Sequence, residues 1–166
     1  GEYTFSDIMD DDGMGTENIP FCIRIVVDGE EILFDFTGSS PQVRGNINIS
    51  FAGLQASVLF ALKVLIDPDG PTNHGMLDPV RIVAEEGSIT NAAFPAATAA
   101  RAQACQRVID IVLGALSKAV PERVIAASNG ANGVSTFFGA GPDGRYYVYL
   151  ETIAGGSGAR SYKDGK

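Results

Sequence analysis

The sequence has few of the residue types on which hydrolytic enzymes and nucleic-acid-binding proteins depend. It contains a single histidine, His74, in 166 residues, whereas most hydrolytic metal sites and catalytic triads use one histidine or more. Its 12 Lys and Arg residues are outnumbered by 20 Asp and Glu residues, which gives a net charge of −8. Because phosphate binding needs clustered cations, this balance argues against a nucleic-acid partner. The chain is also poorly equipped to be a complete enzyme.

Long apolar runs are missing as well. No run of about 20 apolar residues could span a membrane, and we expect no signal peptide, because no basic region followed by an apolar stretch opens the sequence. The two cysteines, Cys22 and Cys105, fall at expected core positions in a strand and a helix. We expect them to be free thiols in a reducing cytoplasm, and a disulfide between them is the less favoured alternative.

The remaining composition is that of one globular domain. Hydrophobic residues make up 45% of the chain, and 166 residues are enough to bury a single core. We find no internal repeat. We therefore expect residues 1–166 to form a single domain, and the strand-like alternation at its very start indicates a fragment from the middle of a longer protein.

One stretch gives the clearest structural signal. Two alternating apolar runs, 21–27 and 30–36, flank the dipeptide Asp28-Gly29. This dipeptide is typical of a two-residue type I′ turn, in which both central residues need a positive φ. The sequence therefore predicts a β-hairpin here.

Two helices follow. Ser50 is a suitable N-cap for a helix over 51–66, and Pro68 lies just beyond its end. Apolar residues predict the buried stripe of this helix: Leu54, Val58, Ala61, Leu62 and Leu65. After a short strand over 80–84, a second apolar stripe predicts a helix over about 98–120.

A second hairpin is predicted over 134–138 and 146–153, with a Pro142-Asp143-Gly144 turn between its strands. The order of elements predicts an α+β fold, in which two long helices pack on one face of a mainly antiparallel sheet of hairpins.

Three features are weaker functional candidates. His74 could act as an acid or base, but a lone loop histidine is more often a surface residue. The run Asp10-Asp11-Asp12-Gly13 does not have the EF-hand spacing, so a solvated acidic turn joining two strands is favoured over a calcium site. The run 155–160 is rich in glycine but lacks the spacing of a phosphate-binding loop. A flexible or tightly packed connector is the favoured interpretation of that run.

Arg101 is unusual because it lies on the apolar stripe of the second helix, near its N-terminus. A cation there opposes the helix dipole, and a core-facing cation needs a partner. Two interpretations stay open. Arg101 pairs with a buried carboxylate such as Asp35, which we favour, or it faces a ligand or a neighbouring chain.

Several motifs together resemble the B subunit of the hydantoinase/oxoprolinase family. The most specific are Asp35-Phe36-Thr37-Gly38-Ser39-Ser40 and Arg44-Gly45-Asn46-Ile47-Asn48. Further matches are Asn73-His74-Gly75, Gly87-Ser88-Ile89, Phe94-Pro95-Ala96-Ala97, Ser128-Asn129-Gly130 and Gly155-Gly156-Ser157-Gly158-Ala159. The resemblance covers essentially the whole chain.

This resemblance implies a subunit of an ATP-dependent hydrolase that opens the cyclic amide of hydantoins or 5-oxoproline. Related ketone carboxylases belong to the same family and form an alternative. In such systems an ATP-binding A subunit phosphorylates the substrate, and the B subunit completes the reaction. ATP with Mg on the partner and a divalent metal in the full-length B subunit are implied. The metal segment of the family lies upstream, and no residue here matches it, so we expect this chain to bind no cofactor or metal itself.

Five polar side chains in or beside the glycine-rich loops could bind such a substrate: Arg44, Asn46, Asn48, Arg101 and Asn129. The competing interpretation is that they hold backbone turns by hydrogen bonds. No catalytic residue is assigned. Two further alternatives stay open for the whole chain, an assembly module of an oligomeric complex without a role in the chemistry and an independent small binding protein.

Overall fold

The computed structural model describes residues 1–130 and 132–166. Four strands form one sheet in the order β1 (Glu2–Asp11), β2 (Glu17–Asp28), β3 (Glu31–Asp35) and β4 (Val80–Val83). The first three strands are antiparallel, and β4 joins the edge of β3 in the parallel direction. The prediction of a mainly antiparallel sheet is confirmed.

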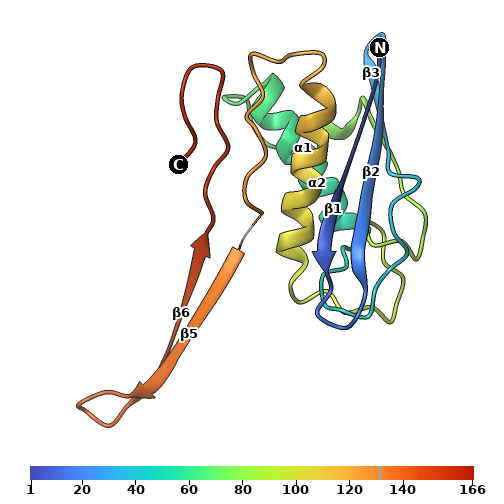
Figure 1. Cartoon of the computed structure of the whole chain (residues 1–166). Helices are drawn as coiled ribbons and strands as arrows, with labels where there is room; N and C mark the ends of the chain where they lie inside the picture. Colours follow the sequence, from blue (N-terminus) through green and yellow to red (C-terminus); the bar gives the residue numbers. More distant parts are fainter. Residues whose placement is uncertain (131) are drawn as a thin grey trace.

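Two helices cover one face of this sheet (Figure 1). The helix α2 (Arg101–Leu116) lies against β1 and β2, and α1 (Phe51–Ile66) packs beside α2. Gly114 allows α2 to approach β1 closely, since a Cβ atom there would lie 2.9 Å from the ring of Phe5. A short 3-10 helix, η1 (His74–Leu77), precedes β4. The predicted α+β fold class is therefore confirmed.

The core lies between the sheet and the helices. Strand β2 contributes alternate residues, as its period of two requires, and both helices contribute one stripe each. The largest fully buried side chains of the core are Ile19, Phe21, Ile25, Phe34, Phe36, Ile49, Leu54, Val58, Ile89, Val108, Ile111 and Val112.

The first helix agrees with its prediction. The hydroxyl of Ser50 accepts a hydrogen bond from the amide of Gly53 at 3.3 Å, and all five predicted stripe residues are buried. The second helix is shorter than the predicted 98–120. It begins only at Arg101, because the amide of Ala100 donates to the carbonyl of Asn46 at 2.9 Å and ties the preceding segment to a loop.

The first hairpin is present, but its turn lies one residue later than predicted. Asp28 pairs with Glu31, so the two central residues are Gly29 and Glu30. Only Gly29 has a positive φ, of 59°. A glycine at the first central position is the pattern of a type II′ turn, so the prediction of type I′ was wrong. Cys22 and Cys105 are free thiols, as predicted, but both are half-buried rather than part of the closed core.

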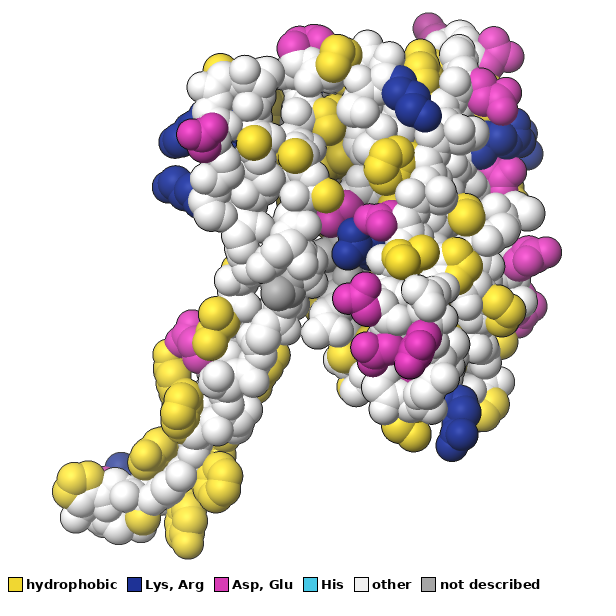
Figure 2. All heavy atoms as spheres, in the orientation of Figure 1, with side chains coloured by type: hydrophobic (Ala, Val, Ile, Leu, Met, Phe, Trp, Pro, Cys, Tyr) yellow, Lys and Arg dark blue, Asp and Glu magenta, His cyan; other side chains and the backbone are white. Residues whose placement is uncertain are grey.

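The second hairpin does not join the sheet of the body. Strands β5 (Asn132–Ala140) and β6 (Tyr146–Ala154) form a separate two-stranded sheet. Residues 132–154, which we call the arm, project away from the helices (Figure 1). Hydrophobic side chains lie along its whole length (Figure 2). The hairpin itself was predicted within two residues at each strand end, whereas its separation from the main sheet was not.

Within residues 1–130 and 132–166, the helices are too short or too polar to cross a bilayer.

The cap of α1 gives a first test. Replacing Ser50 by Ala removes the acceptor for the Gly53 amide, so we expect S50A to lower the free energy of unfolding by about 1 kcal/mol. Urea denaturation of the chain measures this change. S6A, an exposed substitution in β1, should change it by less than about 0.5 kcal/mol. Equal stability of S50A and wild type would contradict the role of the cap.

Candidate functional site

The loop that carries three of the predicted site residues is organised by Asn48. Its side chain is fully buried. The Nδ2 atom lies 2.9 Å from each of the carbonyl oxygens of Val43, Gly45 and Ala97, so its two hydrogens are shared among three acceptors, and Oδ1 accepts from the amide of Val43 at 2.8 Å. Both polar atoms of the side chain are therefore used within the protein, and Asn48 joins loop 43–48 to the segment before α2.

A second buried side chain, Asp12, also holds this loop, so the prediction of a solvated acidic turn was wrong at this residue, where three backbone amides enclose the carboxylate. Its carboxylate accepts hydrogen bonds from the amides of Met14 at 2.8 Å and of Thr16 and Gly45 at 2.9 Å. Burial raises the pKa of Asp12, but the hydrogen bonds from Thr16, Gly45 and Met14 outweigh burial and lower the pKa to about 2. A Cβ atom at Gly45 would overlap the carbonyl oxygen of Asp12, so only glycine fits there.

Three of the predicted substrate-binding side chains are exposed around this framework. Arg44 and Asn46 are exposed on loop 43–48, and Arg101 is exposed at the first position of α2. The hydrogen bond from the Ala100 amide to the Asn46 carbonyl joins the two segments that carry them. The structure therefore brings these three donors to neighbouring backbone segments.

The favoured interpretation of Arg101 was wrong. Asp35 pairs with Arg24, at 3.3 Å, because the two residues are direct cross-strand neighbours in β2 and β3. Arg101 instead places Nη1 3.5 Å from the carbonyl of Thr98 and remains exposed. Exposure to water removes the need for a buried counterion, so the interpretation as a ligand or partner contact stays open.

Asn129 lies apart from the other four residues. Its amide donates to the carbonyl of Gly156 at 3.2 Å, and a Cβ atom at Gly155 would overlap its side-chain oxygen. A Cβ at Gly158 would likewise overlap the carbonyl of Ala126. The glycine-rich run therefore lies against the segment before the arm, where Gly158 leaves no room for a side chain, while most of the run is exposed to solvent.

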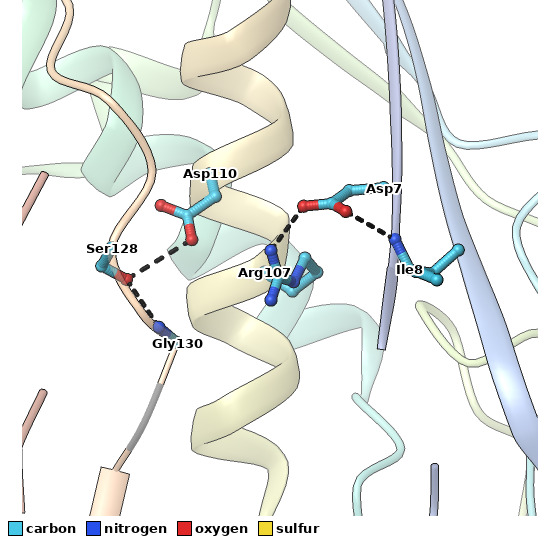
Figure 3. A network of polar contacts seen from close by, with 6 residues as sticks. All are labelled: Asp7, Ile8, Arg107, Asp110, Ser128 and Gly130. Atoms are coloured by element: carbon cyan, nitrogen blue, oxygen red, sulfur yellow. Dashed lines mark hydrogen bonds and ion pairs between the residues drawn. The ribbon is translucent and has the colours of Figure 1, made fainter. Parts of the chain in front are cut away.

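A polar network anchors the segment before the arm to the body (Figure 3). Arg107 of α2 forms an ion pair with Asp7 of β1. One helical turn further on, Asp110 accepts a hydrogen bond from the hydroxyl of Ser128 at 3.4 Å, and that hydroxyl accepts from the amide of Gly130 at 3.1 Å. The network connects three segments that are far apart in the sequence.

Asp110 also lines a cavity of about 720 Å³ between α1, α2 and residues 122–128 and 160–162. The walls are mostly apolar, and the polar side chains around it include Gln106, Arg123 and Arg160. Burial raises the pKa of Asp110, and the hydrogen bond from Ser128 and the charge of Arg107 oppose the rise. None of the five side chains predicted from the sequence to bind substrate lines this cavity. The sequence does contain a signal that could have identified Asp110, because this acidic residue interrupts the apolar run 108–112.

His74 is exposed at the start of η1, where the sequence favoured a surface residue. In the part of the chain that the structure describes, no three His, Cys, Asp or Glu side chains come together in a way that could hold a metal ion. Residues 1–130 and 132–166 therefore do not offer a set of side chains that fits a metal ion.

Comparison with known proteins gives the family. Residues 1–166 match the family Hydantoinase B/oxoprolinase, and the chain belongs to this family. It is 33% identical over 176 residues to a putative D-/L-hydantoinase B subunit of Pseudomonas sp. (strain NS671), covering 99% of this chain and 29% of that protein. It is 38% identical over 154 residues to 5-oxoprolinase 1 of Arabidopsis thaliana, covering 92% of this chain and 11% of that protein.

Two solved structures share the fold. The ATP-dependent caprolactamase from Pseudomonas jessenii superposes with a TM-score of 0.81 at 26% identity, over all of this chain and 29% of that one. A nucleotide-free acetone carboxylase superposes with a TM-score of 0.80 at 16% identity, over 99% of this chain and 24% of that one. The chain thus spans less than a third of the length of each of these four proteins.

The lowered pKa of Asp12 predicts how its contribution to stability depends on pH. A carboxyl with a folded pKa of about 2 and an ordinary value of 3.8 stabilises the fold fully above the ordinary value. The stabilisation is lost as the pH falls from about 4 to about 2. We expect D12N to be less stable than wild type at neutral pH, with a difference that shrinks through this window. Denaturant unfolding across the pH range measures it.

The control for this experiment is D10N, which changes an exposed carboxylate in the same acidic run. It should follow the wild-type curve. A difference between D12N and wild type that is independent of pH would contradict the assigned role of the charge.

Asn48 and Asn46 should behave differently when replaced by Ala. N48A removes a fully buried side chain and with it the hydrogen bonds to the carbonyls of Val43, Gly45 and Ala97 and from the amide of Val43, so we expect a loss of about 2 kcal/mol or more in the free energy of unfolding. N46A keeps the backbone carbonyl that binds Ala100, so its effect should stay within about 0.5 kcal/mol. Thermal and urea unfolding of both variants test this prediction. Equal losses of unfolding free energy in N48A and N46A would contradict the assignment of Asn48 to the buried framework and of Asn46 to the exposed donors.

Proposed function

We propose that this chain is part of the B subunit of an ATP-dependent cyclic-amide hydrolase. In this proposal a partner A subunit phosphorylates the ring of a substrate such as hydantoin or 5-oxoproline, and the B subunit completes ring opening. The observation that carries the proposal is the family match over the whole chain. Relatives named as a hydantoinase subunit and as a 5-oxoprolinase support it.

Hydrolysis is favoured over ketone carboxylation by the comparison of solved structures. The caprolactamase is more similar in sequence to this chain than the acetone carboxylase, whose likeness at 16% identity concerns the fold alone. Hydantoin, 5-oxoproline and caprolactam share a cyclic amide, so the proposed substrate class is a small cyclic amide.

The chemistry explains why exposed donors would be useful here. An unstrained amide is a poor electrophile, and phosphorylation of its oxygen creates a leaving group with several anionic oxygens. Hydrogen-bond donors fixed near such oxygens stabilise the charge that develops as the ring opens. In this proposal Arg44, Asn46 and Arg101 supply donors, and the buried Asn48 and Asp12 hold the backbone that carries them.

Activity assays test the proposed reaction. The A subunit and the complete B subunit, mixed with ATP, should open 5-oxoproline or hydantoin and release phosphate in proportion to product. Carboxylation of acetone or acetophenone without ring opening would overturn the proposal. Chromatographic detection of the opened acid, together with a phosphate assay, distinguishes the two reactions.

Variants of the complete B subunit test the proposed donors. We expect R101A and N46A each to lower turnover roughly 10- to 100-fold, the effect of losing one hydrogen bond to a charged group. Complex formation and melting temperature should stay as in wild type, because both side chains are exposed. R81A, which removes an exposed arginine of β4, is the matched control and should keep its turnover. Loss of the complex in R101A would indicate an assembly role instead.

A further inference from the structure

Loop 43–48 is closed at its base by a segment that comes much later in the chain. Ile49, which follows the loop, accepts a hydrogen bond at its carbonyl from the amide of Ala92 at 2.9 Å. Gln42, which precedes the loop, accepts one at its side-chain oxygen from the amide of Ala93 at 2.8 Å. Adjacent amides of one segment therefore join the two ends of the loop.

The segment that closes the loop is itself held by backbone hydrogen bonds. The amide of Gln42 donates to the carbonyl of Gly87 at 2.8 Å, and the amide of Ile49 donates to the carbonyl of Ile89 at 2.8 Å. The amide of Gly87 donates to the carbonyl of Asn91 at 2.9 Å, which closes a turn between these two residues. Gln42 is thus bonded to this turn through its backbone and to the segment after the turn through its side chain.

These contacts matter most for Arg44, which lies two residues after Gln42. On the C-terminal side of Arg44, the amide of Gly45 donates to the carboxylate of Asp12 at 2.9 Å. On its N-terminal side, Val43 is bonded to a side chain of the same loop, and Gln42 adds a direct contact with a distant segment. The backbone that carries Arg44 is therefore held from both directions.

We propose that Gln42 is a positioning residue for Arg44 in the hydrolytic reaction, a role that rests on the function proposed above. Donors stabilise developing charge only if they are fixed where that charge appears. A displacement of about 1 Å can lower a rate as much as about 100-fold. Gln42 acts through the backbone of the loop and supplies no donor of its own to the substrate.

A positioning role has a kinetic signature that differs from a loss of stability. An interaction that is realised only in the transition state affects kcat and leaves substrate binding in the ground state unchanged. Loosening the base of the loop should therefore lower kcat and leave KM near its wild-type value. A purely structural role would instead lower the melting temperature and the fraction of folded protein.

Two substitutions of Gln42 separate the hydrogen bond from the volume of the side chain. Q42M has a similar length but offers only a weak sulfur acceptor, whereas Q42E keeps an oxygen acceptor for the amide of Ala93. Hydrogen exchange of the peptide that contains Ala93 should be faster in Q42M than in wild type and should remain slow in Q42E. This measurement needs no substrate, and it shows whether the contact has been removed.

Kinetics of the complete B subunit with the A subunit and ATP test the role itself. On whichever of 5-oxoproline and hydantoin the wild-type complex opens, Q42M should lower kcat about tenfold with KM unchanged within about twofold. Q42E should retain kcat within about threefold, because its acceptor remains. Q55M makes the same change at a half-buried glutamine of α1 and is the matched control, with wild-type kcat expected.

A double substitution tests whether Gln42 acts through Arg44. If it does, Q42M should have little further effect once the donor is gone, so R44A and the double variant R44A/Q42M should agree in kcat within about twofold. Independent actions would instead multiply, and the double variant would then lose about another tenfold.

The outcomes distinguish this role from the proposed function. A wild-type complex that opens neither ring would overturn the proposed function and this role with it. Ring opening by the wild type together with a normal kcat in Q42M would overturn the positioning role alone. Equal losses of kcat in Q42M and Q42E, a further tenfold loss in R44A/Q42M, or a loss explained by a lower melting temperature would also overturn the role alone.

Discussion

The need to satisfy one buried amide constrains the geometry of the candidate site. Asn48 is fully enclosed, and a buried polar group without a partner costs about 1–3 kcal/mol. Its partners lie in loop 43–48 and at Ala97, so the loop and the approach to α2 cannot move independently. Asp12, in the turn between β1 and β2, accepts a further hydrogen bond from the amide of Gly45 in this loop. The exposed donors Arg44, Asn46 and Arg101 thus belong to a backbone that is fixed by hydrogen bonds among the turn at Asp12, loop 43–48 and the segment before α2. Fixing polar groups in this way before a substrate binds is how proteins stabilise charge on that substrate.

The parts of the fold that the sequence predicted are those in which local chemistry decides the outcome. The Ser50 cap, Pro68 and the apolar period correctly predicted the two ends and the buried face of α1. Strand alternation likewise identified both hairpins. The errors concern choices between partners that are distant in sequence. Asp35 pairs with Arg24 across the sheet instead of Arg101, and no local pattern separates these two arginines. For the same reason the sequence did not show that β5 and β6 would leave the main sheet, because pairing between hairpins is not encoded in either one.

The candidate site was predictable in part. The asparagine- and glycine-rich motif over 44–48 marked a loop of unusual backbone, and the structure assigns its members to different tasks: Asn48 and Gly45 build the framework, and Arg44 and Asn46 face outward. Burial separates these tasks, and a sequence does not report the burial of a loop residue. Asp110 was missed because a single acidic residue on an amphipathic helix is usually solvated, whereas here residues 122–128 and 160–162 enclose it.

The two ends of the arm meet at its base. The chain leaves the body at Ser128 and Gly130, which the Asp110 network anchors, and it returns at Gly156, whose carbonyl accepts the amide of Asn129 at 3.2 Å. In topological terms the arm is an insertion whose entry and exit are closed by a backbone hydrogen bond. A hairpin attached in this way can be lengthened, shortened or replaced without altering the connectivity of the body. The length of the arm and the geometry of loop 43–48 therefore depend on separate sets of contacts, so a change in one need not alter the other.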